Sequence, residues 1–388
     1  MGRVLDATPV LPPREEAVED ALGRVLAADV HTRAPLPPFD HATMDGYAVR
    51  ATDLAGSLLL PVVGESKAGI SPPPLATRSA MRIFTGAPLP GGADTVVMQE
   101  DVVAEGGVVR FPRIPDRGAN VRRRGEDIGA GEVALARGIV LGPAHLSLLA
   151  SLDLARVGVV ASPRVLVLPT GDELRRAGTP ERPGSIPESN GVAIASMARR
   201  LGATTELVPT AGDDAAGLDR ALSDALPRAD VLVTIGGVSV GDHDLVRPAL
   251  ERAGVELAFY KVRMKPGKPL TLGRHAGGLV LGLPGNPVSA MVTFGLFGSL
   301  ILRKMAGRDA RHTTARARLG APVRHKAGRR ELVRAVLDGG VASPLANQAS
   351  GAVLAMARAN ALVSVPEDVG DLAAGTDVDV YRFEAIGL

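Results

Sequence analysis

A loop rich in lysine and proline carries the residues best suited to chemistry. Lys261, Lys265 and Lys268 lie in one stretch of eight residues, and Pro266 and Pro269 restrict the backbone around them. Ammonium groups held this close together attract an anion, and a phosphate group is the anion that they suit best. The loop therefore predicts a binding site for a phosphorylated ligand.

Two glycine-containing loops complete this predicted anion site. Gly236 and Gly237 follow the short apolar run 231–235, and glycine lets an anionic ligand approach backbone N–H groups. A second loop offers a helix N-terminus, which also attracts anions, because its last two residues suit the N-cap and the first helical position. This loop consists of Pro284, Gly285, Asn286 and Pro287.

Carboxylates stand at or near the ends of the predicted strands beside these loops. They are Asp172, Glu173, Asp213, Asp242 and Asp244. Carboxylate oxygens are hard ligands, and Mg²⁺ is the natural ion beside a phosphate site. Any one of these carboxylates is equally suited to a helix cap or a turn, but several at consecutive strand ends favour a ligand site.

Alternating strands and helices between about residues 164 and 307 must position these loops. The pattern predicts strands over 165–168, 206–208, 231–235, 257–260 and 279–281, and helices over 191–201, 215–226, 244–253 and 287–302. Such alternation is typical of a parallel sheet that is covered on both faces. Ligands of such sheets bind at the carboxyl ends of the strands, where all three loops are expected.

The remaining segments of the chain show other sequence patterns. Residues 14–22 predict a short amphipathic helix, whereas short apolar runs between glycines and prolines predict a β-rich domain over about 55–120. Short β segments after about residue 308 predict a second small β domain. Asp45, Thr85 and Asp127 lie beside glycines in the first part of the chain, where each alone suits a turn.

Composition narrows the class of protein. The 388 residues exceed what one core supports, and 44 basic against 42 acidic residues leave no excess suited to nucleic acid. The chain has no cysteine, which excludes disulfides and thiolate sites. No signal pattern stands at the N-terminus, and the apolar run 288–302 is shorter than the roughly 20 residues of a membrane span. We therefore expect a cytoplasmic protein without nucleic-acid or membrane partners.

One competing motif suggests a hydrolase. Residues 237–241 fit G-x-S-x-G, the nucleophile elbow of α/β hydrolases, with Ser239 as the nucleophile. The candidate bases are His275, His312 and His325. This reading would leave the lysines and the other carboxylates without a role. Neither a Walker A motif nor a G-x-G-x-x-G dinucleotide motif is present.

Eight ordered motifs resemble one family. They are MDGYAV (44–49), TGAP (85–88), GEDI (125–128), TGDEL (170–174), GGVSVG (236–241), KPGKP (265–269), GLPGNPVSA (282–290), and GRR (328–330) with ASG (349–351). Together they are similar to the molybdopterin molybdotransferase family, the MoeA type that includes the gephyrin E domain. The resemblance covers nearly the whole chain.

The resemblance implies a fold and a reaction. The fold is a multidomain α/β and β protein. Residues 163–307 form a three-layer, MogA-like α/β domain with a parallel or mixed sheet. Residues 27–127 form an inserted β-rich domain, and residues 308–388 form a C-terminal small β-barrel. Residues 1–26 with 128–162 form an elongated linker and dimerisation domain. The reaction inserts molybdate into adenylylated molybdopterin and releases AMP, with Mg²⁺ as cofactor.

The resemblance also implies residue roles. The residues implied in catalysis are Asp45, Thr85, Asp127, Glu173, Lys261 and Lys265. Those implied in substrate binding are Gly236, Gly237, Ser239, Lys268, Pro284, Gly285, Asn286, Pro287 and Ser350. The implied metal ligands are Glu173, Asp213 and Asp244.

Partners follow from the same resemblance. A homodimer is implied in which the second subunit contributes Asp45, Thr85 and Asp127. The molybdopterin adenylyltransferase and acceptor molybdoenzymes are implied as further protein partners. Alternative functions are that adenylyltransferase activity itself, which uses the same α/β domain, and a non-enzymatic pterin-binding scaffold.

Overall fold

The computed structural model describes residues 1–212, 214–237 and 245–388. The chain divides into two compact units. The first contains residues 1–15, 23–27 and 158–388, and the second contains residues 16–22 and 28–157. The finer division into four domains stays a prediction.

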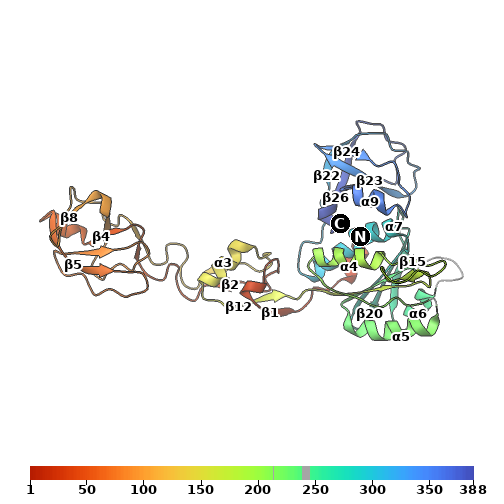
Figure 1. The fold of residues 1–388 in the computed structure, drawn as a ribbon, viewed down its shortest axis with the longest axis horizontal. Helices are drawn as coiled ribbons and strands as arrows, with labels where there is room; N and C mark the ends of the chain where they lie inside the picture. The colour runs from red at the N-terminus through yellow and green to blue at the C-terminus, as the bar shows by residue number, and fades with distance from the viewer. Residues whose placement is uncertain (213, 238–244) are drawn as a thin grey trace. The chain divides into compact units, whose positions relative to one another are not determined.

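A six-stranded mixed sheet organises the first unit (Figure 1). Its order is β16 (Thr204–Leu207), β13 (Arg164–Pro169), β17 (Val231–Ile235), β21 (Gly278–Leu283), β20 (Pro269–His275) and β18 (Glu256–Lys261). The first four strands are parallel, whereas β20 and β18 run antiparallel. The predicted α/β fold is therefore confirmed, with a mixed sheet.

The sheet is buried on both faces because successive side chains of a strand point to opposite sides. Val165 and Val167 pack in one core with α4 (Asn190–Arg200), α7 (Pro287–Thr293) and α8 (Ser299–Met305). Leu166 and Leu168 pack in a second core with α5 (Ala215–Ala225) and α6 (Val246–Arg252). This two-sided burial explains the almost continuous apolar runs in the strand sequences.

The long apolar helix is a core element. A π-helical turn, η4 (Phe294–Gly298), joins α7 and α8. Among the residues that the structure describes, Pro287–Met305 alone is long and apolar enough to span a membrane. Its most apolar window is 83% buried inside the protein, as the predicted core helix requires.

A closed barrel forms the C-terminal region. Its strands are β22 (Ala315–Leu319), β23 (Arg330–Asp338), β24 (Val341–Pro344), β25 (Ala361–Val365) and β26 (Asp377–Arg382). They follow the order β23-β24-β22-β26-β25, and the pairing of β25 with β23 closes the ring. The short strand β19 (Met264–Lys265), from the lysine loop, joins β23 from outside the ring. The predicted small barrel is thus confirmed.

The second unit contains the predicted β-rich region. Its sheet has the order β7-β4-β6-β5-β9-β8. The strands are β4 (Gly46–Val49), β5 (Leu59–Ser66), β6 (Ala80–Ile83), β7 (Thr95–Met98), β8 (Val103–Glu105) and β9 (Val108–Arg110). Leu54, Leu60 and Phe111 are buried in its core.

Short elements complete the chain. The helices are α1 (Gly2–Ala7), α2 (Ala51–Leu54), α3 (Pro143–Ser151) and α9 (Val353–Arg358). The strands are β2 (Val30–His31), β3 (His41–Ala42), β10 (Val121–Arg122), β11 (Val133–Leu135), β12 (Arg156–Val160), β14 (Leu174–Arg175) and β15 (Ile186–Pro187). Single helical turns are η2 (Gln99–Asp101), η3 (Leu226–Arg228) and η5 (Phe383–Ile386).

The predicted helix over 14–22 is wrong. The chain forms β1 (Pro13–Ala17) and one 3-10 turn, η1 (Val18–Asp20), in its place. Val18 donates its backbone N–H to Ala155 O over 3.0 Å, so a tertiary hydrogen bond replaces the local one that a helix would need. The amphipathic segment is too short to form a stable helix by itself, so the tertiary hydrogen bond determines its conformation.

The two-sided core predicts a large effect of Leu232→Ala in β17. Leu232 is 0% exposed, so the change should leave a cavity and lower the free energy of unfolding by about 2–5 kcal/mol. Leu354→Ala, at a leucine that is 64% exposed, should change it by less than about 0.5 kcal/mol. Urea unfolding followed by circular dichroism measures both. Equal losses would contradict the described core.

Candidate functional site

The carboxyl edge of the parallel strands forms a cavity of about 600 Å³. It lies where β13, β17 and β21 end and where α7 begins. It brings together seven predicted site residues: Glu173, Gly236, Gly237, Pro284, Gly285, Asn286 and Pro287. Two of the three predicted loops therefore meet at this sheet edge together with Glu173, whereas none of the lysines of the third loop lines this cavity.

Gly236 and Gly237 are required because the neighbouring residues leave no space for a side chain at either position. A Cβ on Gly236 would lie 2.7 Å from Thr170 O, and one on Gly237 would lie 2.2 Å from Val246 Cγ2. Both residues have positive φ, at +95° and +59°, which glycine adopts most readily. The Gly236 N–H donates to Leu283 O over 3.1 Å. The prediction of a free N–H at Gly236 was wrong, because the strand pairing continues one residue further.

The loop before α7 is fixed from a neighbouring helix. Asn190, the first residue of α4, donates its side-chain N–H to Gly285 O over 2.7 Å. Asn286 and Pro287 occupy the predicted N-cap and first helical positions of α7. The N-terminus of α7 therefore faces the cavity in a defined orientation.

A second cavity of about 520 Å³ lies where the lysine loop meets the barrel. Lys265, Lys268 and Ser350 line it together, as the resemblance implied. Arg329 and Ser289 line it as well. The resemblance had included Arg329 only as part of a motif, without a role. Lys261, which ends β18, lines neither this cavity nor the one at the sheet edge.

A buried arginine holds the segment that carries Ser350. Arg334 is 1% exposed, and its Nη2 donates to Asn347 O over 2.9 Å and to Ala349 O over 3.1 Å. Burial lowers the pKa of Arg334 from its ordinary value. Ser350 O in turn accepts the backbone N–H of Val288, in the first turn of α7, over 3.0 Å. The barrel and α7 thus share this wall of the cavity.

Asp45 and Thr85 are bonded to each other in the second unit. Asp45 Oδ1 accepts the Thr85 backbone N–H over 2.8 Å and the Thr85 hydroxyl over 2.7 Å. These hydrogen bonds stabilise the charged carboxylate and lower the pKa of Asp45 from its ordinary value. Asp127 forms an ion pair with Arg122. The hydrogen bond that Arg122 donates to Asp127 raises the pKa of that arginine.

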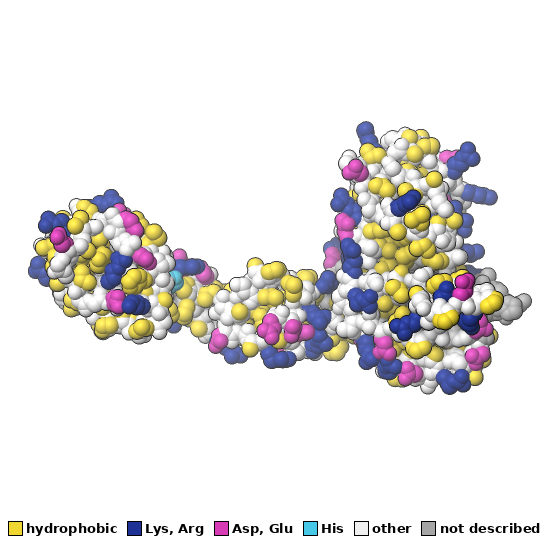
Figure 2. Space-filling model, in the orientation of Figure 1, with side chains coloured by type: hydrophobic (Ala, Val, Ile, Leu, Met, Phe, Trp, Pro, Cys, Tyr) yellow, Lys and Arg dark blue, Asp and Glu magenta, His cyan; other side chains and the backbone are white. Residues whose placement is uncertain are grey.

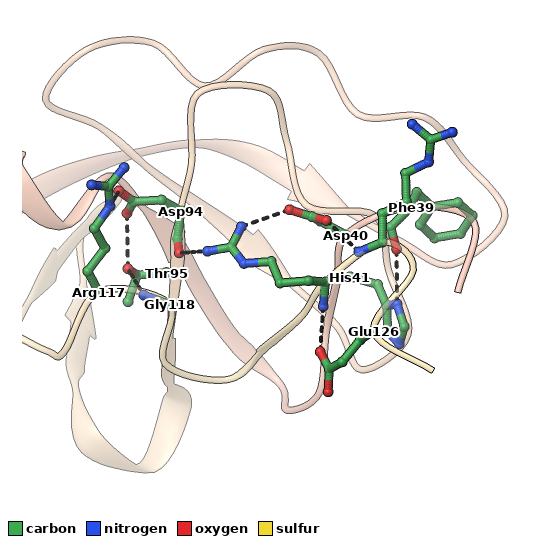
Figure 3. A network of polar contacts seen from close by, with 10 residues as sticks. Phe39, Asp40, His41, Asp94, Thr95, Arg117, Gly118 and Glu126 are labelled. Carbon is green, nitrogen blue, oxygen red and sulfur yellow. Dashed lines mark hydrogen bonds and ion pairs between the residues drawn. The ribbon is translucent and has the colours of Figure 1, made fainter. Parts of the chain in front are cut away.

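A polar network fixes the segments that carry these residues (Figure 3). Asp40 accepts the Arg123 guanidinium Nη1 and the Arg124 backbone N–H, each over 2.7 Å. Burial would raise the pKa of Asp40, but these hydrogen bonds outweigh it and lower the pKa. Glu126 accepts the Arg123 backbone N–H over 2.8 Å. The 122–127 segment is therefore tied to the start of β3.

The loop with Thr85 is tied to the same place. Gly86 donates its backbone N–H to Ala42 O, and Leu89 donates to Asp40 O, each over 2.8 Å. The residues that precede Asp45 thus anchor both the Thr85 loop and the Asp127 segment. One short stretch of the second unit positions all three implied catalytic residues.

The implied Mg²⁺ site cannot be built from the described residues alone. Glu173 lines the sheet-edge cavity, whereas Asp213 and Asp244 lie outside the described residues, as do Asp242 and Ser239. Within the described ranges, no three His, Asp or Glu side chains lie close enough to hold a metal. The carboxylate donor that is described has the oxygen chemistry that Mg²⁺ prefers.

The histidines do not favour the hydrolase reading. His312 contacts Leu296 O through Nε2 at 2.8 Å, and His325 contacts Glu331 through Nδ1 at 3.0 Å. His275 accepts the Gly277 backbone N–H within a turn, over 3.1 Å. Each therefore has a local structural partner.

Fold and site together define a class: an α/β protein with a cavity at the carboxyl edge of its sheet, a C-terminal barrel and an inserted β-rich unit. Three family models match it along nearly its whole length. They are "MoeA N-terminal region (domain I and II)" over residues 1–152, "Probable molybdopterin binding domain" over 166–304 and "MoeA C-terminal region (domain IV)" over 316–383.

Known relatives narrow this class. "Molybdopterin molybdenumtransferase 2" of Mycobacterium tuberculosis is 41% identical over 379 residues, covering 93% of each chain. "Molybdopterin molybdenumtransferase" of Haemophilus influenzae is 40% identical over 75% of this chain and 72% of its own. The solved structure of the molybdopterin biosynthesis MoeA protein from Pyrococcus horikosii has a TM-score of 0.87 at 33% identity, covering 98% of this chain and 97% of its own. The chain belongs to the molybdopterin molybdenumtransferase family.

The bonding of Asp45 predicts how its carboxyl titrates. Its lowered pKa stabilises the fold above the ordinary value near 3.8, and this contribution is lost as the pH falls through the lower, folded pKa. Thr85→Val removes the hydroxyl donor and should raise the pKa of Asp45 toward its ordinary value. Thr52→Val, at an exposed threonine of α2, should leave it unchanged. Carboxyl ¹³C NMR titration measures both, and no difference between them would contradict the described pair.

Proposed function

We propose that this protein is a molybdopterin molybdotransferase, which inserts molybdate into adenylylated molybdopterin and releases AMP. The observation that carries the proposal is the match to relatives named molybdenumtransferases along almost the whole chain. The two cavities support it, because the reaction needs a place for a phosphorylated ligand and a place for a tetrahedral oxyanion.

The sheet-edge cavity suits the phosphorylated pterin. It lies within residues 166–304, the part matched by the molybdopterin-binding family model. The N-terminus of α7 faces it, and helix N-termini attract phosphate groups through their N–H groups and dipole. Gly236 and Gly237 line it, and without a Cβ their backbone packs closely against Thr170 and Val246.

The cavity beside the barrel suits molybdate. Lys265, Lys268 and Arg329 supply positive charge, and the hydroxyls of Ser289 and Ser350 supply neutral donors. Molybdate and phosphate are both tetrahedral oxyanions, so donors that suit one suit the other. Lys265 and Lys268 belong to the loop that runs into β20, which ties this cavity to the α/β sheet.

Mg²⁺ and a homodimer complete the proposal. Glu173, Asp213 and Asp244 would hold Mg²⁺, which when bound would neutralise charge on the phosphate oxygens. Asp45, Thr85 and Asp127 would come from the second subunit of a homodimer. Light scattering checks the dimer directly. A solution mass equal to the chain mass of 39.9 kDa would contradict the homodimer. A cytoplasmic location stays a prediction.

Two alternatives are not favoured. One is the preceding adenylyltransferase reaction, and the other is a pterin-binding scaffold without turnover. Both are at odds with the names of the relatives that cover the chain. Formation of adenylylated molybdopterin from ATP would support the first, and tight binding without AMP release would support the second.

The proposed function predicts AMP release from adenylylated molybdopterin that requires molybdate and stops when EDTA removes Mg²⁺. Lys265→Ala should raise the half-saturating molybdate concentration about tenfold or more, because a hydrogen bond to a charged group is worth roughly 1.5–3 kcal/mol. Lys67→Ala is the matched control and should behave as wild type. Lys67 is an exposed lysine in the second unit, directly after β5. Release of AMP that ignores molybdate in the wild-type protein would contradict the proposal.

A further inference from the structure

The barrel reaches the site through one pair of strands. β19 pairs in parallel with β23, and the register places Lys265 opposite Glu331. The backbone N–H of Arg330 also donates to Arg263 O over 3.1 Å. Side chains of directly paired residues project to the same side of a sheet. The barrel therefore presents Glu331 to the lysine that the proposed function places at the oxyanion.

Both carboxylate oxygens of Glu331 are engaged. Oε1 lies 2.6 Å from Lys265 Nζ, and Oε2 lies 3.0 Å from His325 Nδ1. The side chain of Glu331 is 12% exposed and that of His325 is 1% exposed, whereas that of Lys265 is 47% exposed. One end of the contact is thus buried, and the other end is partly exposed and lines the cavity.

The buried end is itself anchored. The backbone N–H of His325 donates to Asp371 Oδ1 over 2.7 Å. A carboxylate accepts and does not donate, so the ring nitrogen facing Glu331 carries the proton. Burial would raise the pKa of Glu331, but the hydrogen bonds from Lys265 and His325 outweigh it and lower the pKa. Glu331 is therefore ionised when it contacts Lys265.

Lys265 stands between two basic cavities. Besides the cavity with Ser350, it lines one of about 620 Å³ together with Arg324, Lys326 and Arg329. Glu331 lines both cavities as well. Figure 2 shows Lys and Arg side chains around the barrel in the view that is drawn. A flexible lysine in such surroundings has many places to point its ammonium group, and a fixed carboxylate selects one of them.

We propose that Glu331, anchored by His325, is a positioning residue that fixes the Lys265 ammonium group for oxyanion binding. Lysine has three N–H donors. One is directed at Glu331, which leaves two for the ligand. Holding the ammonium group in place before binding reduces the conformational freedom that binding would otherwise remove. The proposal rests on the proposed function only in identifying the oxyanion as molybdate.

If Glu331 acted only through its negative charge, and not by positioning Lys265, its removal would have the opposite effect on anion binding. Glu331 places a negative charge beside an anion site, so removing that charge without any positioning role would tighten anion binding. Glu367 is the control, because its backbone O accepts the N–H of Gly328, which lines the cavity with Arg324, and its 48% exposed carboxylate contacts Arg263 and neither Lys265 nor His325 among the described contacts. Glu367→Gln removes one negative charge and should leave binding unchanged or tighter.

The test is calorimetric binding of sodium molybdate, and of sodium tungstate, to the full chain. We expect Glu331→Gln to raise Kd about fivefold or more while Glu367→Gln does not raise it. In a Lys265→Ala background, Glu331→Gln should add less than a twofold change, because the residue acts through Lys265. In the AMP-release assay, Glu331→Gln should raise KM for molybdate, with kcat at saturation within about twofold of wild type.

Three results would overturn the inference. They are an unchanged or lower Kd in Glu331→Gln, the same fold-change with and without Lys265, and a fall in kcat without a change in KM. If Glu331→Gln does not fold, His325→Gln removes the second anchor of Glu331 and should raise Kd at least twofold. Binding is measured without turnover. A wild-type protein that shows this coupling but no AMP release would therefore contradict the proposed function and leave the positioning role standing.

Discussion

Burial of four parallel strands on both faces is the constraint on which the first unit depends. Alternate residues of β13 must satisfy two different helix layers, so neither face can carry the chemistry. Polar and glycine residues are therefore confined to the loops at the strand ends. Because the parallel strands share one carboxyl edge, those loops meet there and form the cavity with Glu173 and Gly237.

The barrel and the lysine loop line a second cavity, separate from the one at the sheet edge. The barrel strand β23 takes β19 as a neighbour, which holds the lysine loop against the barrel wall. The buried Arg334 fixes the Ser350 segment on the other side of the same cavity. The C-terminal region therefore forms one wall of this cavity and is not an independent appendage.

In the second unit, too, the implied catalytic residues lie in loops, and hydrogen bonds hold those loops in place. Its implied catalytic residues occupy short loops, which a short β sheet alone would not hold in place. Hydrogen bonds to Ala42 and Asp40 anchor the Thr85 loop, and the pairs with Arg123 and Arg124 anchor the segment before Asp127. Fixed carboxylates are thus available in this unit, with Asp45 ionised by its bonds to Thr85.

Local patterns were sufficient to predict the elements that periodicity governs. The strand at 231–235, the helix that begins at Pro287 and the small β regions all appear where the sequence indicated them. The same local patterns failed at residues 14–17, where β1 forms, because a tertiary hydrogen bond at Val18 outweighed a weak helical preference. They also failed at the Gly236 N–H, because β17 continues its pairing with β21 by one more residue.

Long-range pairing explains what the sequence could not indicate at the site. Lys265, Lys268 and Ser350 were implied as one site by motif, and they line one cavity. The contact between Lys265 and Glu331 depends on the register of β19 against β23, which no local pattern encodes. Glu331 follows motif residues without standing out among them, and only the folded barrel gives it a partner.

The measurement that tests this account most directly is X-ray diffraction from crystals soaked in tungstate, collected at a tungsten absorption edge. We expect an anomalous peak in the cavity lined by Lys265, Lys268 and Ser350, with the contact between Lys265 and Glu331 retained. A tungsten peak only at other basic side chains, with this cavity empty under saturating tungstate, would contradict it.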